Sequence, residues 1–472
     1  MNDFRRSLRI SDQKFGWVAV VVMAVLAVYA IVFVLERMLF LDAPFMLSNI
    51  INSGSPRIME HRYGSVITQI WPWMGMKAGL PLIWLMHLYN GAFNVFYLVV
   101  VCLLVFRWRA YGAAVLMALY YTAMSDQAFF WTNNEIHQAV AWFFVWYGFY
   151  LYQRKRAGLR RKRFIWFGMT ATIAAVTHPL MVPVLAFTWI FLLMTEERQT
   201  GDGKVRVGLT MMIVMACCIR IWFSLRAGWY DRDKVETVKT NLLSGITEVF
   251  DKPLAAQLLH QYSHGLIVGA VLGLAGLFLL MVRRKYLLSL MYLLVIVSYH
   301  LLFLSAFDTW VDFYSQSEMM PLTIIYGLPV IRFLPEYIGS RLLFSITVIV
   351  FLIRLIMIPV ASVPFTKRVS NTMSLIREMK EKNITKALIP DNQDLESIYI
   401  MTWGLPIETV LASAISGDRQ RTVKPLPADK LEEAVHTPSN QFLDCFRIIP
   451  INTMNPYYFN LDSVGRYEVV RQ

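Results

Sequence analysis

Apolar runs alternate with short polar or basic segments along the first 361 positions of the chain. Because the runs are continuous, they favour membrane-spanning helices of about 20 residues over the alternating strands of a transmembrane barrel. The pattern predicts eleven spans, at 17–41, 82–106, 110–128, 136–152, 164–177, 180–194, 207–226, 265–282, 287–306, 319–337 and 341–361. The fifth and sixth runs form one apolar stretch broken at His178-Pro179, so one long kinked helix is the alternative to two short helices.

The composition also favours a polytopic membrane protein. Of the 472 residues, 57% are hydrophobic and 16% are charged, and the mean hydropathy is +0.48. Since soluble domains carry about 25% charged residues, these values argue against a soluble enzyme, a disordered chain and a disulfide scaffold. The run at 17–41 is too long for a cleavable signal peptide and lacks a small-residue cleavage site, so we expect it to remain as the first span.

The formal net charge of +13 is distributed as a membrane topology requires and does not indicate a nucleic-acid partner. The bases cluster between apolar runs or at their ends, as in cytoplasmic loops. The clusters are Arg5, Arg6, Arg9 and Lys14; Arg107 and Arg109; Arg154, Lys155, Arg156, Arg160, Arg161, Lys162 and Arg163; Arg283, Arg284 and Lys285; and Arg332 and Arg341. With a cytoplasmic N-terminus and eleven spans, every cluster falls on the cytoplasmic side and the C-terminal segment falls outside.

The last part of the chain has the composition of a soluble domain. Residues 370–382 are predicted as an amphipathic helix, followed by apolar runs at 387–390, 409–415 and 442–449. The pattern suggests a small α/β domain. We therefore divide the chain into a transmembrane part, 1–361, with a long outer loop at 42–79, and an extracytoplasmic part, 362–472.

Two charged residues of the first outer loop are candidates for chemistry. Asp42 follows the first span directly, where a carboxylate can act as a general base on an acceptor hydroxyl or amine. It can equally cap the helix expected after it. Arg62 carries a guanidinium that could bind a phosphate with two hydrogen bonds, or it could face lipid headgroups without a specific role.

Other polar residues at the ends of predicted spans have the same two interpretations. His178, at the break between spans five and six, could donate to a phosphate or cap the turn. Glu135 lies at the mouth of span four and could contact substrate or end a helix. The four cysteines have no metal-binding spacing. No nucleotide-binding loop, dinucleotide fingerprint, zinc signature or serine-hydrolase elbow is present, which argues against a nucleotide-driven pump.

Several short motifs together resemble the GT-C membrane glycosyltransferases, which include the protein O-mannosyltransferases and the lipid A aminoarabinose transferases. These motifs are the acid that ends span one, the amphipathic stretch 43–54, Arg62-Tyr63-Gly64, and the Trp- and Pro-rich approach to span two. The turn Val176-Thr177-His178-Pro179 resembles the Thr-Lys-x-Pro turn of that superfamily. Phe313-Tyr314-Ser315-Gln316 is similar to its aromatic element before a late helix, and Lys382-Asn383-Ile384-Thr385 is similar to the start of its small extracytoplasmic domain.

The resemblance implies a GT-C-like helical membrane protein in the bacterial cytoplasmic (inner) membrane, with its reaction at the periplasmic or extracellular face. It implies inverting transfer of a sugar from a polyprenyl-phosphate donor to a glycan, lipid or protein acceptor. Asp42 would be the catalytic base and Arg62 a phosphate ligand; Tyr63, Glu135, His178 and Tyr314 are further candidates for substrate contact. No cofactor is implied, and although a divalent metal could assist, no residue pattern forms a metal site. The alternative is a non-enzymatic transporter or flippase of a lipid-linked glycan.

Overall fold

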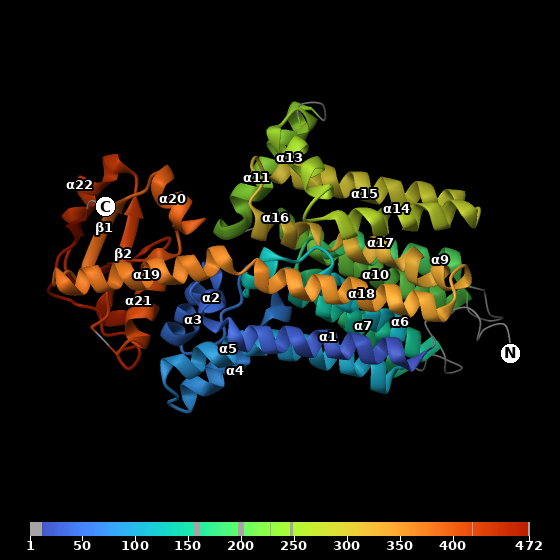
Figure 1. Cartoon of the computed structure of the whole chain (residues 1–472), viewed down its shortest axis with the longest axis horizontal. Helices are drawn as coiled ribbons and strands as arrows, with labels where there is room; N and C mark the ends of the chain where they lie inside the picture. The colour runs from blue at the N-terminus through green and yellow to red at the C-terminus, as the bar shows by residue number, and fades with distance from the viewer. Residues whose placement is uncertain are drawn as a thin grey trace.

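A computed structural model describes residues 12–154, 161–196, 203–226, 228–245, 249–417 and 419–470. Long helices run side by side and form most of the molecule (Figure 1). Their bounds are α1 (Gln13–Val32), α2 (Val34–Met38), α5 (Leu82–Cys102) with the π-helix η3 (Leu103–Arg107), α6 (Tyr111–Thr122), α7 (Glu135–Arg154), α8 (Arg161–Thr177), α9 (Met181–Thr195), α10 (Gly203–Leu225), α14 (Ile267–Val282), α15 (Tyr286–Ala306), α17 (Leu322–Phe333) and α18 (Ser340–Val360). The predicted bases at 5, 6, 9, 155, 156 and 160 lie outside the described residues.

Five helical segments in the described chain are long and apolar enough to cross a bilayer, at 13–32, 82–107, 203–225, 286–306 and 340–381. The pair α13 (Pro253–Tyr262) and α14, bent by 81°, adds a sixth if it forms one span. The chain is thus a helical protein with several candidate membrane spans. Helices that are shorter or less apolar occupy the other predicted spans, and α8 and α9 are two helices separated at His178-Pro179.

The first predicted span, 17–41, is longer than the helix that the structure contains. The helix α1 ends at Val32 because the backbone at Phe33 leaves the helical region (φ −99°, ψ 36°). A short helix, α2, follows, and Leu41 then adopts a positive φ of 51° before a new helix begins at Asp42. Asp42 therefore begins the helix α3 (Asp42–Ser53) and does not end the first span.

The predicted outer segments contain helices of their own. The loop at 42–79 contains α3, η2 (Tyr63–Ser65) and α4 (Val66–Lys77), and the segment after α6 contains η4 (Gln127–Phe130). Later come α11 (Trp229–Ser244), α13, α16 (Asp312–Met319) and η5 (Leu334–Glu336). The helices α2, α3 and α4 lie at the end of the bundle that faces the C-terminal part, opposite the N-terminus (Figure 1).

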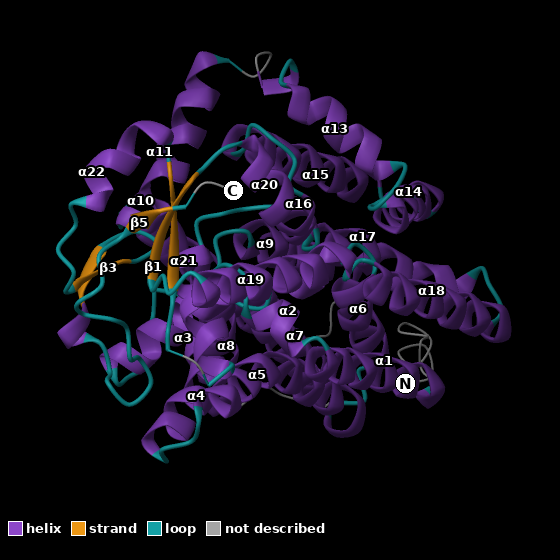
Figure 2. Cartoon of the chain, turned by 60° about the vertical axis from the view of Figure 1, so that its left-hand side comes forward, coloured by secondary structure: helices purple, strands orange, loops and turns teal. Residues whose placement is uncertain are grey.

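All strands in the described residues lie after residue 385, and the long helix α19 (Val363–Glu381) connects them to the bundle (Figures 1 and 2). The strands β1 (Lys386–Pro390), β2 (Thr422–Leu426) and β5 (Glu468–Val469) form a parallel sheet in the order β2-β1-β5. The strands β3 (Gln441–Leu443) and β4 (Ile448–Pro450) form an antiparallel pair. The remaining elements are α20 (Gln393–Tyr399), α21 (Leu405–Ile415), η6 (Ala428–Lys430), α22 (Leu431–Val435) and η7 (Ile451–Thr453).

The apolar run at 409–415 forms most of the helix α21. Residues 405–413 of this helix are all buried, including the polar Glu408, Thr409 and Ser413, so no exposed polar face gives its sequence a helical periodicity. The helix lies against β2, where the Thr409 hydroxyl accepts a hydrogen bond from the Val423 N–H at 3.1 Å. The helix predicted at 370–382 is the second half of the longer α19.

Candidate functional site

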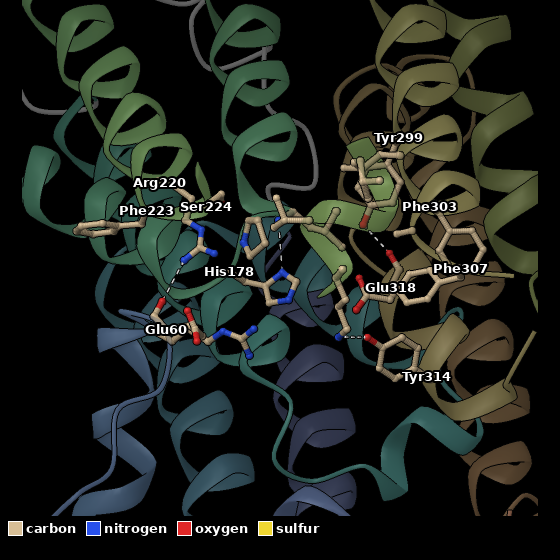
Figure 3. A pocket seen from close by; sticks show the side chains of 18 residues that line it. Glu60, His178, Arg220, Phe223, Ser224, Tyr299, Phe303, Phe307, Tyr314 and Glu318 are labelled. Carbon is tan, nitrogen blue, oxygen red and sulfur yellow. Dashed lines mark hydrogen bonds between the residues drawn. The ribbon is translucent and has the colours of Figure 1, made fainter. Parts of the chain in front are cut away.

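Three of the predicted site residues, Arg62, His178 and Tyr314, line one cavity of about 260 Å³ (Figure 3). They come from the start of η2, the turn between α8 and α9, and α16. Two carboxylates, Glu60 and Glu318, also line it. Apolar side chains of α10, α11 and the end of α15 form much of the rest: Phe223, Val235, Val238, Leu302, Phe303, Ala306 and Phe307. Because α10 and α15 are candidate membrane spans, and these residues lie at the helix ends, the cavity lies where two such spans end.

Four basic or imidazole side chains from four elements line this cavity: Arg62, His178, Arg220 of α10 and Lys234 of α11. Arg220 is buried in the apolar part of α10, and its Nη1 donates to the carbonyl oxygens of Val176 at 3.1 Å and Glu60 at 3.4 Å. Figure 3 shows Arg220 beside Glu60, with Tyr314 and Glu318 on the other side of His178. Arg220 thus joins α10 to the two segments that carry Arg62 and His178.

His178 is a neutral hydrogen-bond donor in this surrounding. Its Nδ1 accepts the Leu180 N–H at 3.3 Å, which assigns the proton to Nε2. Burial, together with the charges of Arg62, Arg220 and Lys234, holds the pKa of His178 well below its usual value of 6.5. The imidazole therefore offers an N–H without adding a charge.

Lys234 remains charged at the rim of the cavity, where the residue is exposed to solvent. Desolvation by the neighbouring side chains lowers its pKa, but Tyr314 and Glu318 outweigh this effect, so the pKa of Lys234 is raised overall. Its Nζ donates to the Tyr314 hydroxyl at 2.5 Å. Burial raises the pKa of Tyr314 to about 12, so the phenol is neutral at ordinary pH. The pair brings a fixed positive charge to the cavity.

Glu135 contacts Arg62 and does not line the cavity. Its Oε2 lies 2.8 Å from Arg62 Nη1, and the two side chains are only 13% and 8% exposed. Glu135 is the first residue of α7, where the helix dipole favours a carboxylate. The ion pair therefore fixes the position of Arg62 relative to α7.

Asp42 is buried, with 6% of its surface exposed, and is not among the residues that line the cavity. Its Oδ2 accepts a hydrogen bond from Trp131 Nε1 at 2.7 Å. The Trp131 ring in turn lies 4.7 Å from the Tyr314 ring, centroid to centroid. One indole ring therefore separates Asp42 from a residue of the cavity wall. Asp42 is the first residue of α3, and Leu41 occupies the N-cap position.

Tyr63 does not join this group. Its side chain is 49% exposed, and its hydroxyl contacts His61 Nδ1 at 3.3 Å.

Sequence reasoning missed Lys234 as a site residue, since a lysine in a polar helix carries no distinctive signal. Arg220 lies within an apolar predicted span, and a charged residue in such a position is the signal that could have identified it.

Within the described part of the chain, no group of three or more His, Cys, Asp or Glu side chains could hold a metal ion. No family model, curated protein or solved structure matches this chain. The function is therefore inferred from the chemistry of the cavity and its surroundings.

Proposed function

We propose that this protein is an integral-membrane glycosyltransferase that moves a sugar from a polyprenyl-phosphate donor to a glycan, lipid or protein acceptor. The observation that carries the proposal is the cavity in which Arg62, Arg220, Lys234 and the His178 N–H occur together with apolar side chains of α10, α11 and α15. A phosphate joined to a hydrocarbon chain has both chemistries. The resemblance to the GT-C glycosyltransferases supports the same substrate class.

The basic groups have a chemical role in such a reaction. As the bond from the anomeric carbon to the phosphate oxygen breaks, negative charge develops on that oxygen. Charged donors held in advance stabilise this charge more in a dry cavity than they would in water. Arg62 and Lys234 are suited to this role because Glu135 and Tyr314 hold them in place.

Asp42 is the proposed general base. It would take the proton of the acceptor hydroxyl or amine while that group attacks the anomeric carbon, and the phosphate would leave with inversion of configuration. The hydrogen bond from Trp131 fixes one oxygen of the carboxylate, and the ring contact of Trp131 with Tyr314 connects this carboxylate to the cavity.

The Asp42→Asn variant tests this proposal. The amide keeps the shape of the side chain but is not basic, so we expect sugar transfer to fall about 100-fold or more while donor binding is retained. The full-length protein would be reconstituted in liposomes with radiolabelled polyprenyl-phosphate sugars and membrane acceptors. Asp429→Asn, at an exposed position, is the matched control.

Near-normal transfer by a well-folded Asp42→Asn protein would refute the role of the base. Movement of the lipid across the bilayer without any transfer of sugar by the wild-type protein would favour the transporter instead.

We also propose eleven spans, a cytoplasmic N-terminus and an extracytoplasmic C-terminal part in a bacterial cytoplasmic membrane. The charge pattern of the loops supports this topology. The structure adds support, since the turn between α14 and α15, which carries Arg283, Arg284 and Lys285, lies at the end of the bundle far from the strands (Figure 1).

A further inference from the structure

Leu41, the residue before Asp42, has an unusual backbone. Its φ is 51° and its ψ is −108°, a region that residues with a Cβ rarely adopt, and its side chain is buried. Such a conformation persists only where the surrounding structure holds it. The contacts of Leu41 therefore determine where α3 begins and how the Asp42 carboxylate is presented.

The contact that holds this backbone comes from the far end of the sequence. The Leu41 N–H donates to Glu408 Oε1 at 2.8 Å, and Glu408, on α21, is completely buried. Arg368 of α19 binds the same carboxylate, with Nη2 at 2.8 and 2.7 Å from its two oxygens and Nε at 3.1 Å from Oε2. Both oxygens of Glu408 thus accept hydrogen bonds.

Two further contacts fit this arrangement. A Cβ on Gly404 would lie 2.3 Å from Glu408 Oε1 and 3.0 Å from Leu41 Cα, so only glycine leaves room for the two residues to meet. The guanidinium of Arg368 lies 5.3 Å from the ring centroid of Phe40, which also packs edge-on against Phe365 of α19. Helix α19 therefore contacts residue 40, and helix α21 contacts residue 41.

We propose that Glu408, held by Arg368, is a positioning residue for Asp42 and acts through the backbone of Leu41. The inference rests on the proposed function in one respect, namely that Asp42 is the base. The C-terminal part of the chain then completes the transferase site although it supplies no residue to the cavity. Displacing Glu408 changes how Asp42 meets Trp131 and leaves the phosphate-binding residues in place.

Two variants displace this contact in different ways. Glu408→Gln keeps the shape, but its amide nitrogen must face either the Leu41 N–H or the donors of Arg368. Gly404→Ala keeps the charges of Glu408 and Arg368 and places a methyl group against Glu408. The φ of −78° at Gly404 suits alanine. It serves as the second test if Glu408→Gln does not fold. Glu432→Gln, at an exposed position of α22, is the control for the same chemical change.

The full-length protein, labelled with 5-fluorotryptophan, gives a readout that does not depend on the reaction. The Trp131 signal in the ¹⁹F NMR spectrum is assigned by its loss in Trp131→Phe, and Asp42→Asn shows how it responds to a change at Asp42. We expect Glu408→Gln and Gly404→Ala to shift this signal and to lower kcat about 10-fold or more. The donor KM should change less than about twofold. The control changes neither quantity.

An unchanged Trp131 signal and an unchanged kcat in the folded variants would overturn the proposal. A lower Tm with a normal kcat would also overturn it, because the contact of Glu408 with Leu41 would then only stabilise the fold. If the signal moves but the wild-type protein transfers no sugar, the proposed function fails while the positioning contact stands. If the wild type transfers sugar and the signal does not move, only the positioning role fails.

Discussion

Arg62 is held by Glu135 on one side and faces the cavity on the other. A buried guanidinium in this position can contribute about 1.5–3 kcal/mol to binding a phosphate, the range of hydrogen bonds to charged groups. We therefore expect Arg62→Ala to weaken donor binding about 10-fold or more. The measurement is the Kd of the reconstituted protein for the polyprenyl-phosphate sugar.

Arg57 provides the control for this prediction, because it lies in the same loop but is exposed and does not line the cavity. Arg57→Ala should change the Kd by less than about twofold, since exposed charges contribute about 0–1 kcal/mol. Equal losses in the two variants would mean that the loop attracts anionic lipid headgroups without a specific site.

His178 gives the protein a defined dependence on pH. Its pKa in the folded state is lowered, so as the pH falls below about 6.5 the unfolded chain binds a proton that the folded chain does not. This residue therefore lowers the stability of the folded state as the pH falls, and it has no such effect above that pH.

Replacing His178 by glutamine removes the titrating group. Between about pH 7.5 and about pH 5.5, His178→Gln should lose about 1 kcal/mol less stability than the wild type, which a smaller drop in Tm in detergent would show. The exposed His436→Gln is the control. Equal drops in wild type and His178→Gln would contradict the prediction.

At the level of single residues, the sequence indicated which residues are chemically suited to a site better than it indicated where their side chains point. Arg62, His178 and Tyr314 meet in one cavity. Arg62 was identified as an arginine of the first outer loop, His178 from the break between two predicted spans, and Tyr314 from the family resemblance. Tyr63, the neighbour of Arg62, points away because successive side chains of a tight turn leave in different directions. The contribution of Lys234 depends on how α11 packs against the bundle, which no local pattern encodes.

Among the elements, the approach of η2 to α7 and α8 is set by one glycine. The Gly64 N–H donates to Thr177 Oγ1 at 3.1 Å, and its carbonyl oxygen accepts from Trp142 Nε1 at 3.2 Å. A Cβ at this position would lie 2.1 Å from Thr177 Oγ1 and 2.9 Å from Trp142 Cδ1. Alanine would therefore push η2, and with it Arg62, away from α8.

We expect Gly64→Ala to destabilise the protein by about 1–3 kcal/mol, the usual cost of overpacking, and to weaken donor binding as well. Thermal unfolding and the donor Kd would be measured together. Gly91→Ala, in α5, is the control because its Cβ would meet nothing within 4 Å. It should be neutral or stabilise the protein by up to about 1 kcal/mol. Unchanged stability and binding in Gly64→Ala would show that the neighbours can move aside.

Element boundaries were predictable where an apolar run ends in polar residues and not where burial continues past a break. The first predicted span runs on to 41 because residues 38–41 are apolar and buried, although the helix α1 ends at Val32. The run at 409–415 gave no helical period because α21 is buried on every side. In both cases tertiary contacts, and not local pattern, decide the outcome.

For the whole molecule, contacts between distant segments constrain the topology independently of any count of spans. Arg447 Nη2 donates to Asn49 Oδ1 at 2.8 Å, and the Asn455 N–H donates to Asn52 Oδ1 at 2.9 Å. These contacts, like that of Glu408 with Leu41, join the C-terminal part to α3. Segments in direct contact outside a bilayer lie on the same side of it. In the proposed topology α3 and the C-terminal part both lie outside the bilayer. The chain between them then crosses the membrane an even number of times, and the ten predicted spans after the first satisfy this condition.

Cysteine labelling in intact cells checks this topology. In a background without the four native cysteines, single cysteines at the exposed positions Ser55, Lys285 and Glu432 sample the first outer loop, the α14–α15 turn and α22. We expect Ser55→Cys and Glu432→Cys to react with a membrane-impermeant maleimide from outside, and Lys285→Cys to react only after permeabilisation, because basic turns stay in the cytoplasm. Labelling of Ser55→Cys alone from outside would place α3 and the C-terminal part on opposite sides, against their contacts. Labelling of Lys285→Cys from outside would reverse the side on which we place the cavity.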